Sequence, residues 1–429
     1  MEQYPKILVI TVSAWNSKVG ANTWAALLDK YDSKNIANIC IRDEVPDCSV
    51  CSRYFAISEN KVIKSILKHS IKTGKEVTAT SGNSEEDLNA HNQRYTAMKK
   101  HRRYSMLLAR ELVWKVGRWK TPELDAFLDS FQPDIILHSM EGYIHLNRII
   151  QYTIQRTGAK AIGYIWDDNF TYKQSSHLGY KIYRFFQRKS LKRLAKKTTE
   201  FFAISEMTKQ EADAFFGINS IVLTKPLSST PSVSYSDLKL PIKMLYTGNL
   251  FIGRDRSLLR VVKAVKQLPK NSFVIDVYTK TQLSKEMLIE LESDICHIHA
   301  PISQKEVLER QKQADVLLFL EDIDGPDANM ARLSFSTKTT DYLSSGRCIF
   351  AVGCADTAPM QYFMQTKAAI TACSVTEIAD KLQTLPKEIN LIEEYAHIAA
   401  QVGVTNHSRE KIQEVFNKTI QNVFYSGHP

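Results

Sequence analysis

The stretch from Asp315 to Val352 most constrains how this chain folds. It opens on a continuous apolar run, Val316 to Leu320, with the length and flanks of a strand buried on both faces. An acidic loop punctuated by Gly and Pro follows, and hydroxyl residues then precede a helical pattern over Lys338–Ser345 that stops at Gly346. A second buried strand, Cys348 to Val352, closes the unit. This order of elements places backbone N–H groups and one lysine where a phosphate binds.

The same alternation of buried runs and helical patterns extends along the chain, which indicates βαβ units and parallel sheets. From about Asn60 to Lys120 the pattern is polar and largely helical, with a loop predicted at Thr78–Ser84. The other predicted strands are Ile7–Val12, Ile39–Ile41, Asp134–His138, Ala161–Trp166, Phe201–Ile204, Ile221–Leu223, Lys243–Thr247, Phe273–Tyr278, Ile295–Ile298 and Ala368–Ala372.

The length of 429 residues exceeds one ordinary core, so we expect two domains of about 200 residues each. The Ser- and Pro-rich segment Pro226–Pro241 is the linker candidate. We predict an α/β chain with a Rossmann-like domain over 1–226 and a second over 227–405. Residues 406–429 are predicted to form a closing helix.

The composition is that of a globular protein, with 44% hydrophobic and 24% charged residues. No apolar run reaches the roughly 18 residues that span a bilayer, and no secretory signal is evident, so we expect a cytoplasmic protein. Seven scattered cysteines indicate reduced thiols. Cys48 and Cys51 form a CxxC, but a zinc site needs a second pair. The cysteines therefore predict no metal site, and we also expect no permanently bound cofactor.

The formal charge of +10 is concentrated in two clusters. Eight Lys/Arg and no acid lie between Lys181 and Lys197, and eight more lie between Lys99 and Lys120, opposed only by Glu111. Nucleic acid is disfavoured as a partner, because no aromatic platform or known binding module accompanies the charge.

Within the first cluster, one helical face carries apolar residues and another carries Lys181, Arg184 and Arg188. Such a basic amphipathic helix can lie on an anionic membrane surface. A solvated helix whose aromatic residues belong to the core is the alternative. The apolar residues are Leu178, Ile182, Phe185 and Phe186.

The second domain begins with the segment MLYTGNLFIGRDRSLLRVVKAV, which predicts a strand, a turn, a basic loop and a helix that starts near Ser257. Gly248 and Gly253 permit close backbone approach to a ligand. Arg254 and Arg256 stand at the start of the helix, where they suit a diphosphate, because arginine binds its oxygens in bidentate fashion. A tight turn with solvated arginines is the alternative.

Lys338 falls in the first turn of its predicted helix, where a lysine opposes the helix dipole unless an anion is bound. Asp341 lies one turn later and can accept hydrogen bonds from ribose hydroxyls. The plainer interpretation is a solvated lysine followed by an ordinary acid near the start of a helix.

The segment TKTTDYLSSGRCIFAV resembles the PSKLFEYLAAGKPVIA-type segment of family-4 retaining glycosyltransferases, which have the GT-B fold. APISQKEVLERQKQADVLLFL and FFAISEMTKQEADAFFGI are similar to two further segments of that family. The resemblance runs from about Phe201 to about Val352. It implies two Rossmann-like domains facing across a cleft, with the C-terminal helix crossing back to the first.

The resemblance also implies site residues. Arg254 and Lys338 would hold the diphosphate of a nucleotide-sugar, and Asp341 would bind its ribose. The first phosphate loop of the family corresponds to Gly248 and Asn249, and its distal phosphate contacts correspond to Ser336 and Thr337. The family's glutamate eight residues before the ribose acid falls on Leu333. The sugar-side carboxylate is therefore sought among Glu321, Asp322 and Asp324.

In the first domain, the strand Ala161–Trp166 is followed by Asp167 and Asp168. The family often carries His-Asp at this strand end, so these carboxylates are the catalytic candidates, binding donor hydroxyls or orienting an acceptor hydroxyl. The same residues also suit a turn and helix cap. His138 and Glu141, at the end of the preceding strand, are weaker candidates, since such a histidine is more often structural.

The resemblance thus predicts a glycosyltransferase of the hexosyltransferase type that moves a sugar from a UDP-sugar to a hydroxyl acceptor, retaining and metal-independent. We expect a role in bacterial-type surface polysaccharide or glycoconjugate assembly. The expected acceptor is a lipid-linked glycan, with the protein peripheral on the inner membrane face. Homo-oligomerisation stays open. A non-catalytic glycosyltransferase-like subunit that binds a partner transferase or its acceptor is the alternative.

Overall fold

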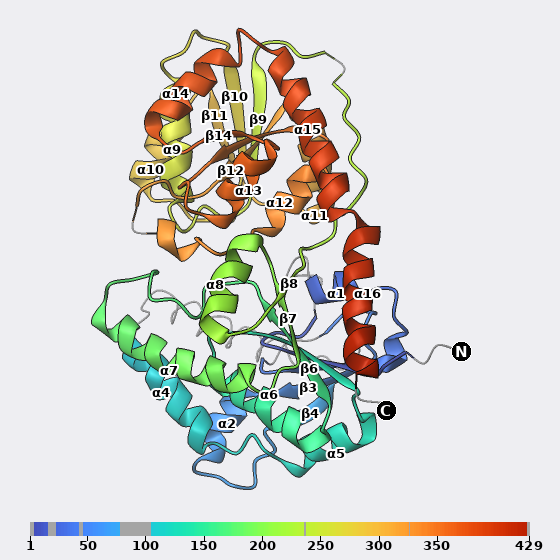
Figure 1. Ribbon diagram of the computed structural model, residues 1–429. Helices are drawn as coiled ribbons and strands as arrows, with labels where there is room; N and C mark the ends of the chain where they lie inside the picture. Colours follow the sequence, from blue (N-terminus) through green and yellow to red (C-terminus); the bar gives the residue numbers. More distant parts are fainter. Residues whose placement is uncertain are drawn as a thin grey trace. The chain divides into compact units, whose positions relative to one another are not determined.

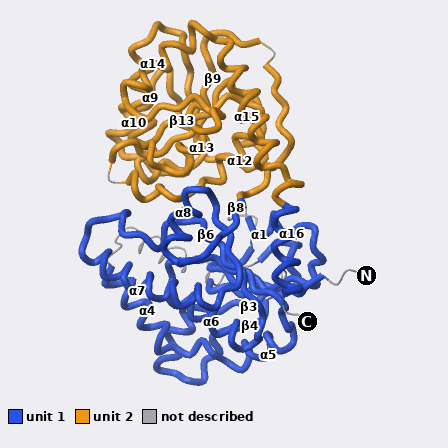
Figure 2. The backbone as a smooth tube through the Cα atoms, viewed as in Figure 1, with its two compact units in different colours: residues 1–223, 413–429 blue, residues 224–412 orange. Residues whose placement is uncertain are grey.

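The computed structural model describes residues 4–15, 23–42, 46–77, 104–235, 237–325 and 327–426. The chain forms two compact units (Figure 2). Unit 1 comprises residues 1–223 and 413–429, and unit 2 comprises residues 224–412. The predicted loop at Thr78–Ser84 lies outside the described residues. Within the described ranges, no helix is long and apolar enough to cross a membrane.

Unit 1 is built on a sheet of eight described strands in the order β4-β3-β2-β1-β5-β6-β7-β8 (Figure 1). Every neighbouring pair is parallel except β3–β4, which is antiparallel. The strands are β1 Ile7–Thr11, β2 Ile36–Cys40, β3 Arg53–Ile57, β4 Gly74–Val77, β5 Ile135–Ser139, β6 Lys160–Ile165, β7 Glu200–Ala203 and β8 Ile221–Val222.

The helices of unit 1 cover this sheet and include the end of the chain. They are α1 Thr23–Leu28, α2 Glu59–Ser65, α4 Tyr104–Val116, α5 Pro122–Phe131, α6 Ile144–Thr157, α7 Leu178–Ala195, α8 Glu206–Phe216 and most of α16 Arg409–Tyr425, with the short 3-10 helix η2 Ser33–Asn35. The α16 helix packs Phe416 against Tyr31 and Phe202, at ring-centroid distances of 6.2 and 5.9 Å. Gln413 Nε2 donates to the Leu27 carbonyl at 2.6 Å. The predicted return of the C-terminal helix to the first domain is confirmed.

Unit 2 is built on a parallel sheet of six described strands in the order β11-β10-β9-β12-β13-β14. Numbered along the chain this is 3-2-1-4-5-6, the doubly wound order. The strands are β9 Ile242–Thr247, β10 Phe273–Tyr278, β11 Cys296–His299, β12 Val316–Leu320, β13 Cys348–Val352 and β14 Ile370–Ala372. The predicted bounds of β10, β12 and β13 match these ranges.

Each face of the unit 2 sheet is buried under helices. Val316, Leu318 and Leu320 pack in one cluster with residues of α9 and α14, while Leu317 and Phe319 pack on the other side with residues of α12, α13 and α15. Burial on both faces explains why the strand reads as an unbroken apolar run. The helices are α9 Arg254–Val265, α10 Lys285–Leu291, α11 Gln304–Gln313, α12 Thr337–Leu343, α13 Ala358–Thr366, α14 Val375–Thr384 and α15 Asn390–His407, with the 3-10 helix η3 Ala328–Met330.

One predicted boundary is wrong, and two strands were not predicted. The α9 helix begins at Arg254 and not near Ser257, because Gly253 at φ 74° ends the preceding turn directly before it. The region from Asn60 to Lys120 also contains the strand β4, and β3 was not predicted at all. Both are short strands near the edge of the sheet, where a run of four or five residues carries little periodic signal.

The segment Pro226–Pro241 forms no helix or strand in its described residues. It lies against unit 2, where Tyr235 Oη donates to the Asp315 carbonyl at 3.0 Å and accepts from the Cys348 N–H at 2.9 Å. Gly346, at φ 70°, ends the α12 region as the sequence predicts. A β-carbon there would overlap the carbonyl oxygen of Ser232, so the position requires glycine.

Candidate functional site

The carboxyl ends of β9 and β12 lie side by side at the point where the strand order of unit 2 reverses. In open α/β sheets, ligands bind outside the carboxyl ends of the strands at such a switch point. Gly248 and Asn249 directly follow β9, and Glu321 directly follows β12. The glycine loop and the acidic loop singled out in the sequence therefore meet at this edge.

Lys338, from the first turn of α12, reaches this edge. Its Nζ donates to Tyr246 Oη at 3.0 Å and lies 4.3 Å from the centre of the Tyr246 ring. Tyr246 Oη in turn donates to the Asn249 carbonyl at 2.6 Å. Gly248 has φ 136°, and a β-carbon there would overlap Lys338 Nζ and lie 2.7 Å from its Cε. The backbone conformation therefore requires glycine, and a β-carbon there would also displace the end of the Lys338 side chain.

The electrostatics of Lys338 set it apart from a surface lysine. Removal of the ammonium from water, followed by the nearby positive charge of Arg254, lowers the pKa of Lys338 to about 7. In the described part of the chain its ammonium forms no salt bridge and has only the neutral Tyr246 hydroxyl as hydrogen-bond partner. Two cations thus lie close together, and an anion bound between them would stabilise both.

Arg254 is fixed by a carboxylate. Its Nη2 lies 2.8 Å from Glu321 Oε1, and its Nε lies 3.2 Å from Glu321 Oε2 and 3.2 Å from the Leu320 carbonyl. Burial acts to lower the pKa of Arg254, but the charge and hydrogen bonds of Glu321 outweigh it, and the pKa is raised. The Glu321 side chain is buried. The guanidinium therefore keeps one orientation.

The remaining acids of this loop are paired with arginines of α9. Arg256 Nη2 lies 2.7 Å from Asp322 and 2.9 Å from Asp327, and Arg260 Nη2 lies 2.6 Å from Asp324. All three candidates for the sugar-side carboxylate, Glu321 included, are thus engaged by arginines. Leu333 is fully buried and has an apolar side chain, so this position supplies no carboxylate.

Of the other residues predicted near the start of α12, Asp341 and Ser336 have hydrogen-bond partners. Asp341 Oδ1 accepts from Lys225 Nζ at 2.6 Å. The Ser336 hydroxyl caps the helix by accepting from the Lys338 N–H at 3.3 Å, and Thr337 is exposed. Sequence reasoning missed Lys225 and Tyr246. Tyr246 left a readable signal, since it stands two residues before Gly248 and thus on the same face of β9.

In unit 1 the two predicted catalytic carboxylates differ in surroundings. Asp168 is buried, and its Oδ1 accepts from the N–H groups of Phe170 at 3.4 Å and Thr171 at 2.8 Å, while its Oδ2 accepts from the Thr171 hydroxyl. It therefore shapes the turn after β6. Asp167 is exposed.

Glu141 leaves β5 at the same edge, since β5 and β6 are parallel neighbours. Burial, and then the charge of Asp167, raise the pKa of the Glu141 carboxyl to about 7. Arg42, whose Nη1 donates to Ser13 Oγ at 3.0 Å, lowers it. The structure brings Glu141 and Asp167 into electrostatic contact, a pairing the sequence did not reveal.

His138 and the CxxC have structural surroundings. His138 is fully buried with its Nε2 3.1 Å from Thr198 Oγ1, and burial lowers its pKa to about 4. Burial raises the pKa of the Cys51 thiol to about 12, so the thiolate is disfavoured. Among the described residues, no group of three or more His, Cys, Asp or Glu side chains is placed to hold a metal ion.

No protein-family model matches the chain, and no curated protein matches it in sequence. Solved structures match the chain in three dimensions. HepE of Anabaena, in complex with UDP and glucose, superposes with a TM-score of 0.63 at 9% identity over 98% of this chain and 100% of that one. TarM gives a TM-score of 0.62 at 9% identity over 99% of each chain. The pneumococcal O-GlcNAc transferase GtfA, in complex with UDP and GlcNAc, gives 0.52 at 15% identity over 71% of this chain and 60% of that one.

At such low sequence identity, these structural matches show a shared fold alone. Both the HepE and the TarM comparison cover nearly the whole length of each chain, so both parallel-sheet units and the long C-terminal helix are included. The chain has the GT-B fold.

Proposed function

We propose that this chain is a glycosyltransferase that binds the diphosphate of a nucleotide-sugar with Arg254 and Lys338 and transfers the sugar to a hydroxyl acceptor. The observation that carries the proposal is Lys338. Its desolvated ammonium lies near a second cation and has the Tyr246 hydroxyl as its described hydrogen-bond partner, and the charges of Glu321 and Asp341 do not outweigh these effects on its pKa. Such an arrangement costs stability unless an anion occupies it in the working state.

We propose UDP as the nucleotide, because HepE was crystallised with UDP-glucose and GtfA with UDP. In the proposed complex, Gly248 and Asn249 bring the backbone after β9 close to the diphosphate. Ser336 and Thr337, at the start of α12, lie on the distal phosphate side. Asp341, oriented by Lys225, accepts hydrogen bonds from the ribose hydroxyls. Residues 227–405 form the donor-binding domain.

The proposed chemistry is electrostatic. Cleavage of the bond between the sugar and the diphosphate places negative charge on the departing phosphate, and Arg254 and Lys338 stabilise that charge where it develops. Glu321 holds Arg254 in position for this role. Because Arg254 and Lys338 can contact the departing diphosphate directly, we propose transfer without a divalent metal. We propose retention of the anomeric configuration from the resemblance to family-4 enzymes.

The acceptor side of the proposal lies in residues 1–226. Asp167, with Glu141 near it, is the residue we propose to bind or orient the acceptor hydroxyl, whereas Asp168 supports the turn. We propose a lipid-linked glycan in surface polysaccharide or glycoconjugate assembly as the acceptor, at the cytoplasmic membrane face.

A second candidate is a non-catalytic subunit that binds a partner transferase or its acceptor. It is favoured by Leu333, which is buried where family-4 enzymes carry a glutamate. One matching structure, at a TM-score of 0.51 and 12% identity, is a complex of GtfA with a second protein, GtfB.

Calorimetric titration with UDP-, GDP-, ADP- and dTDP-sugars, followed by assay of nucleotide release, separates these functions. We expect a UDP-sugar to bind, Lys338→Ala to weaken it at least tenfold, and Lys285→Ala, an exposed lysine of α10, to leave it unchanged. Binding without release of UDP in the presence of acceptor glycans favours the subunit. If no nucleotide-sugar binds, or if Lys338→Ala binds like the parent, the proposal is wrong.

A further inference from the structure

The outward face of α7 is apolar over its first half. Leu178, Ile182, Phe185 and Phe186 are 71%, 44%, 54% and 46% exposed. These residues recur at intervals of three and four, so they form one stripe along the helix. The aromatic residues therefore do not belong to the core, which excludes that interpretation of the sequence.

The inward face of α7 carries polar as well as apolar residues. The residues of α7 that are buried are Tyr180, Tyr183, Arg184, Gln187, Ser190, Leu191, Leu194 and Ala195. Arg184, predicted on the basic face of the helix, is buried and donates to Gln174 Oε1 at 2.6 Å. A helix that exposes two phenylalanines while it buries an arginine and a glutamine departs from the pattern of an ordinary surface helix. Its outer face is thus suited to contact something other than water.

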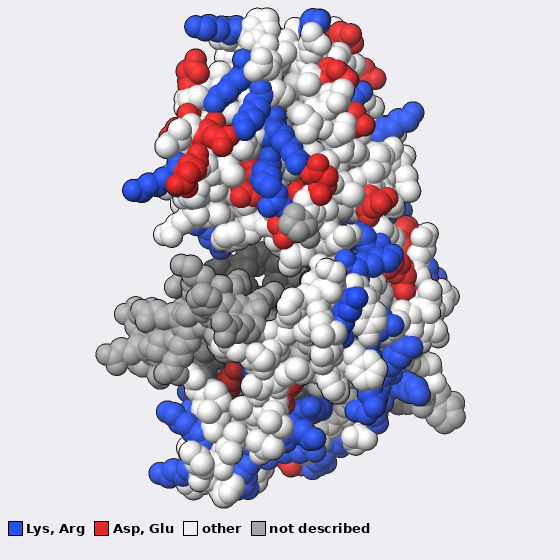
Figure 3. All heavy atoms as spheres, turned by 90° about the vertical axis from the view of Figure 1, so that its left-hand side faces the viewer, with Lys and Arg blue, Asp and Glu red and all other residues white. Residues whose placement is uncertain are grey.

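The exposed cations of the segment share the face of the apolar stripe. They are Lys181, Lys189, Lys192, Arg193, Lys196 and Lys197, and no acid occurs between residues 178 and 197. On the face of the molecule drawn in Figure 3, uncharged surface of unit 1 is bordered by Lys and Arg side chains. Near the start of α7 the face thus combines the apolar residues with Lys181, and toward its end it is cationic.

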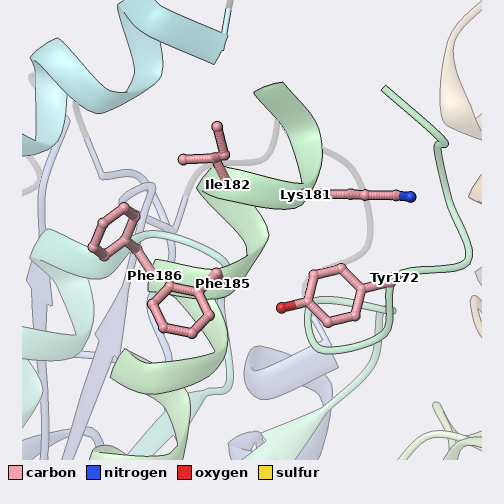
Figure 4. A pocket seen from close by; sticks show the side chains of 5 residues that line it. All are labelled: Tyr172, Lys181, Ile182, Phe185 and Phe186. Atoms are coloured by element: carbon pink, nitrogen blue, oxygen red, sulfur yellow. The ribbon is translucent and has the colours of Figure 1, made fainter. Parts of the chain in front are cut away.

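A hollow of about 590 Å³ opens beside this stripe and is lined by Tyr172, Lys181, Ile182, Phe185 and Phe186. Tyr172, from the loop before α7, points toward Phe185 (Figure 4). Arg188 holds this wall in place. Its guanidinium lies 4.5 Å from the Tyr172 ring centre and 4.2 Å from that of Phe215, and its Nη1 donates to the Phe170 carbonyl.

We propose that the outward face of α7 docks unit 1 on an anionic lipid bilayer. In this arrangement the helix lies in the plane of the interface. Its aromatic first half and the hollow contact the boundary of headgroups and acyl chains, and its lysines contact anionic headgroups. The 18-residue helix offers about 27 Å of contact along the surface.

The chemistry of the cations selects a membrane over a protein partner. Five of the six exposed cations are lysines, and lysine is depleted at protein interfaces, where arginine is enriched. Near an anionic bilayer, in contrast, each Lys or Arg strengthens binding about fivefold. This inference concerns lipid binding alone and does not rest on transferase activity.

The test is flotation of the full-length protein with vesicles of neutral phosphatidylcholine, and of phosphatidylcholine with about a third phosphatidylglycerol. We expect binding to the anionic vesicles, weakened as salt rises from about 0.05 to 0.5 M because the cations are screened. The triple variant Lys181→Gln, Lys189→Gln, Arg193→Gln should lower the partition coefficient about a hundredfold. The matched control Lys285→Gln, Lys305→Gln, Lys312→Gln removes the same charge from exposed sites of unit 2 and should have little effect.

The aromatic half is tested separately by Phe185→Ser with Phe186→Ser. Both side chains are exposed, so the fold should survive, as circular dichroism would show. We expect at least a tenfold loss of binding that persists at high salt, whereas Ile289→Ser, an 80% exposed residue of α10, should bind as the parent does. Failure of the parent to float with anionic vesicles at low salt overturns the proposal, as does equal binding by the α7 variants and their controls.

Discussion

The Arg254 guanidinium and the Glu321 carboxylate form a two-point ion pair at the carboxyl edge of the unit 2 sheet, with contacts of 2.8 and 3.2 Å. Arg254 opens α9 and Glu321 follows β12, so the pair joins the two sides of the topological switch point. The pair both orients the arginine and cancels one of the two positive charges at the candidate diphosphate site.

Replacing Glu321 with Gln should therefore strengthen UDP binding while weakening the fold. The site gains one net positive charge, and we expect roughly tenfold tighter binding. The largely buried arginine loses its counter-charge, which should cost about 2 kcal/mol of unfolding free energy. Calorimetry and urea unfolding measure the two effects. Weaker UDP binding by a stably folded variant would show that Glu321 supports the ligand and does not merely offset Arg254.

We predict that Lys338 takes up a proton when the nucleotide binds. Its pKa of about 7 leaves the side chain mostly neutral at pH 8. A bound diphosphate raises that pKa, so binding at pH 8 should take up about one proton. UDP affinity should fall as pH rises above about 7. Calorimetry at pH 8 in buffers of different ionisation enthalpy measures the uptake, and Lys338→Met should abolish it. Equal heats in all buffers for the parent would contradict the assignment.

The same lysine links stability to pH. Its pKa is lower in the folded state than the usual value near 10.4, so between about pH 7 and 10 the unfolded chain binds the extra proton. The Lys338 contribution to the unfolding free energy should therefore rise with pH across that window. Urea unfolding of the parent and of Lys338→Met should show different slopes there, and parallel slopes would contradict the prediction.

Gly248→Ala should damage both the fold and the site. The change forces an alanine to φ 136° and places its β-carbon on the Lys338 ammonium, so we expect a loss of about 2–3 kcal/mol and at least tenfold weaker UDP binding. Gly217→Ala is the matched control, because Gly217 has φ 70° and a β-carbon added there would meet nothing within 4 Å. That control should lose only about 1 kcal/mol. Equal losses in the two variants would exclude crowding by Lys338.

The two acids after β6 should separate structure from activity. Asp168→Ala removes the acceptor for two N–H groups and one hydroxyl, which should cost about 2 kcal/mol of unfolding free energy. Asp167 is exposed, so Asp167→Asn should change the unfolding free energy by less than about 0.5 kcal/mol. The same variant should lower the rate of sugar transfer at least tenfold. Unfolding curves and a transfer assay measure both. Full activity of Asp167→Asn would remove it from the catalytic candidates.

Much of the fold could be predicted because its signals are local. Val316–Leu320 and Cys348–Val352 were predicted with the bounds that the structure has, since a strand buried on both faces needs an unbroken apolar run. Gly346 and the Ser336 cap could likewise be predicted from the sequence. Glycine adopts the positive φ that ends a helix, and a serine hydroxyl accepts from a free N–H at the start of one. The short strands β3 and β4 were missed, since pairing with neighbours and not pattern defines them.

The sequence by itself therefore determined the alternation of strands and helices and the presence of Arg254 and Lys338 at two loop–helix junctions. Only the tertiary structure decided their partners. Arg254 meets Glu321 and Lys338 meets Tyr246 across separations of 67 and 92 residues, because parallel strands bring their carboxyl ends to one edge. The outward direction of Phe185 and Phe186 was also decided there, because helical periodicity groups residues on a face but does not say which face the core will cover.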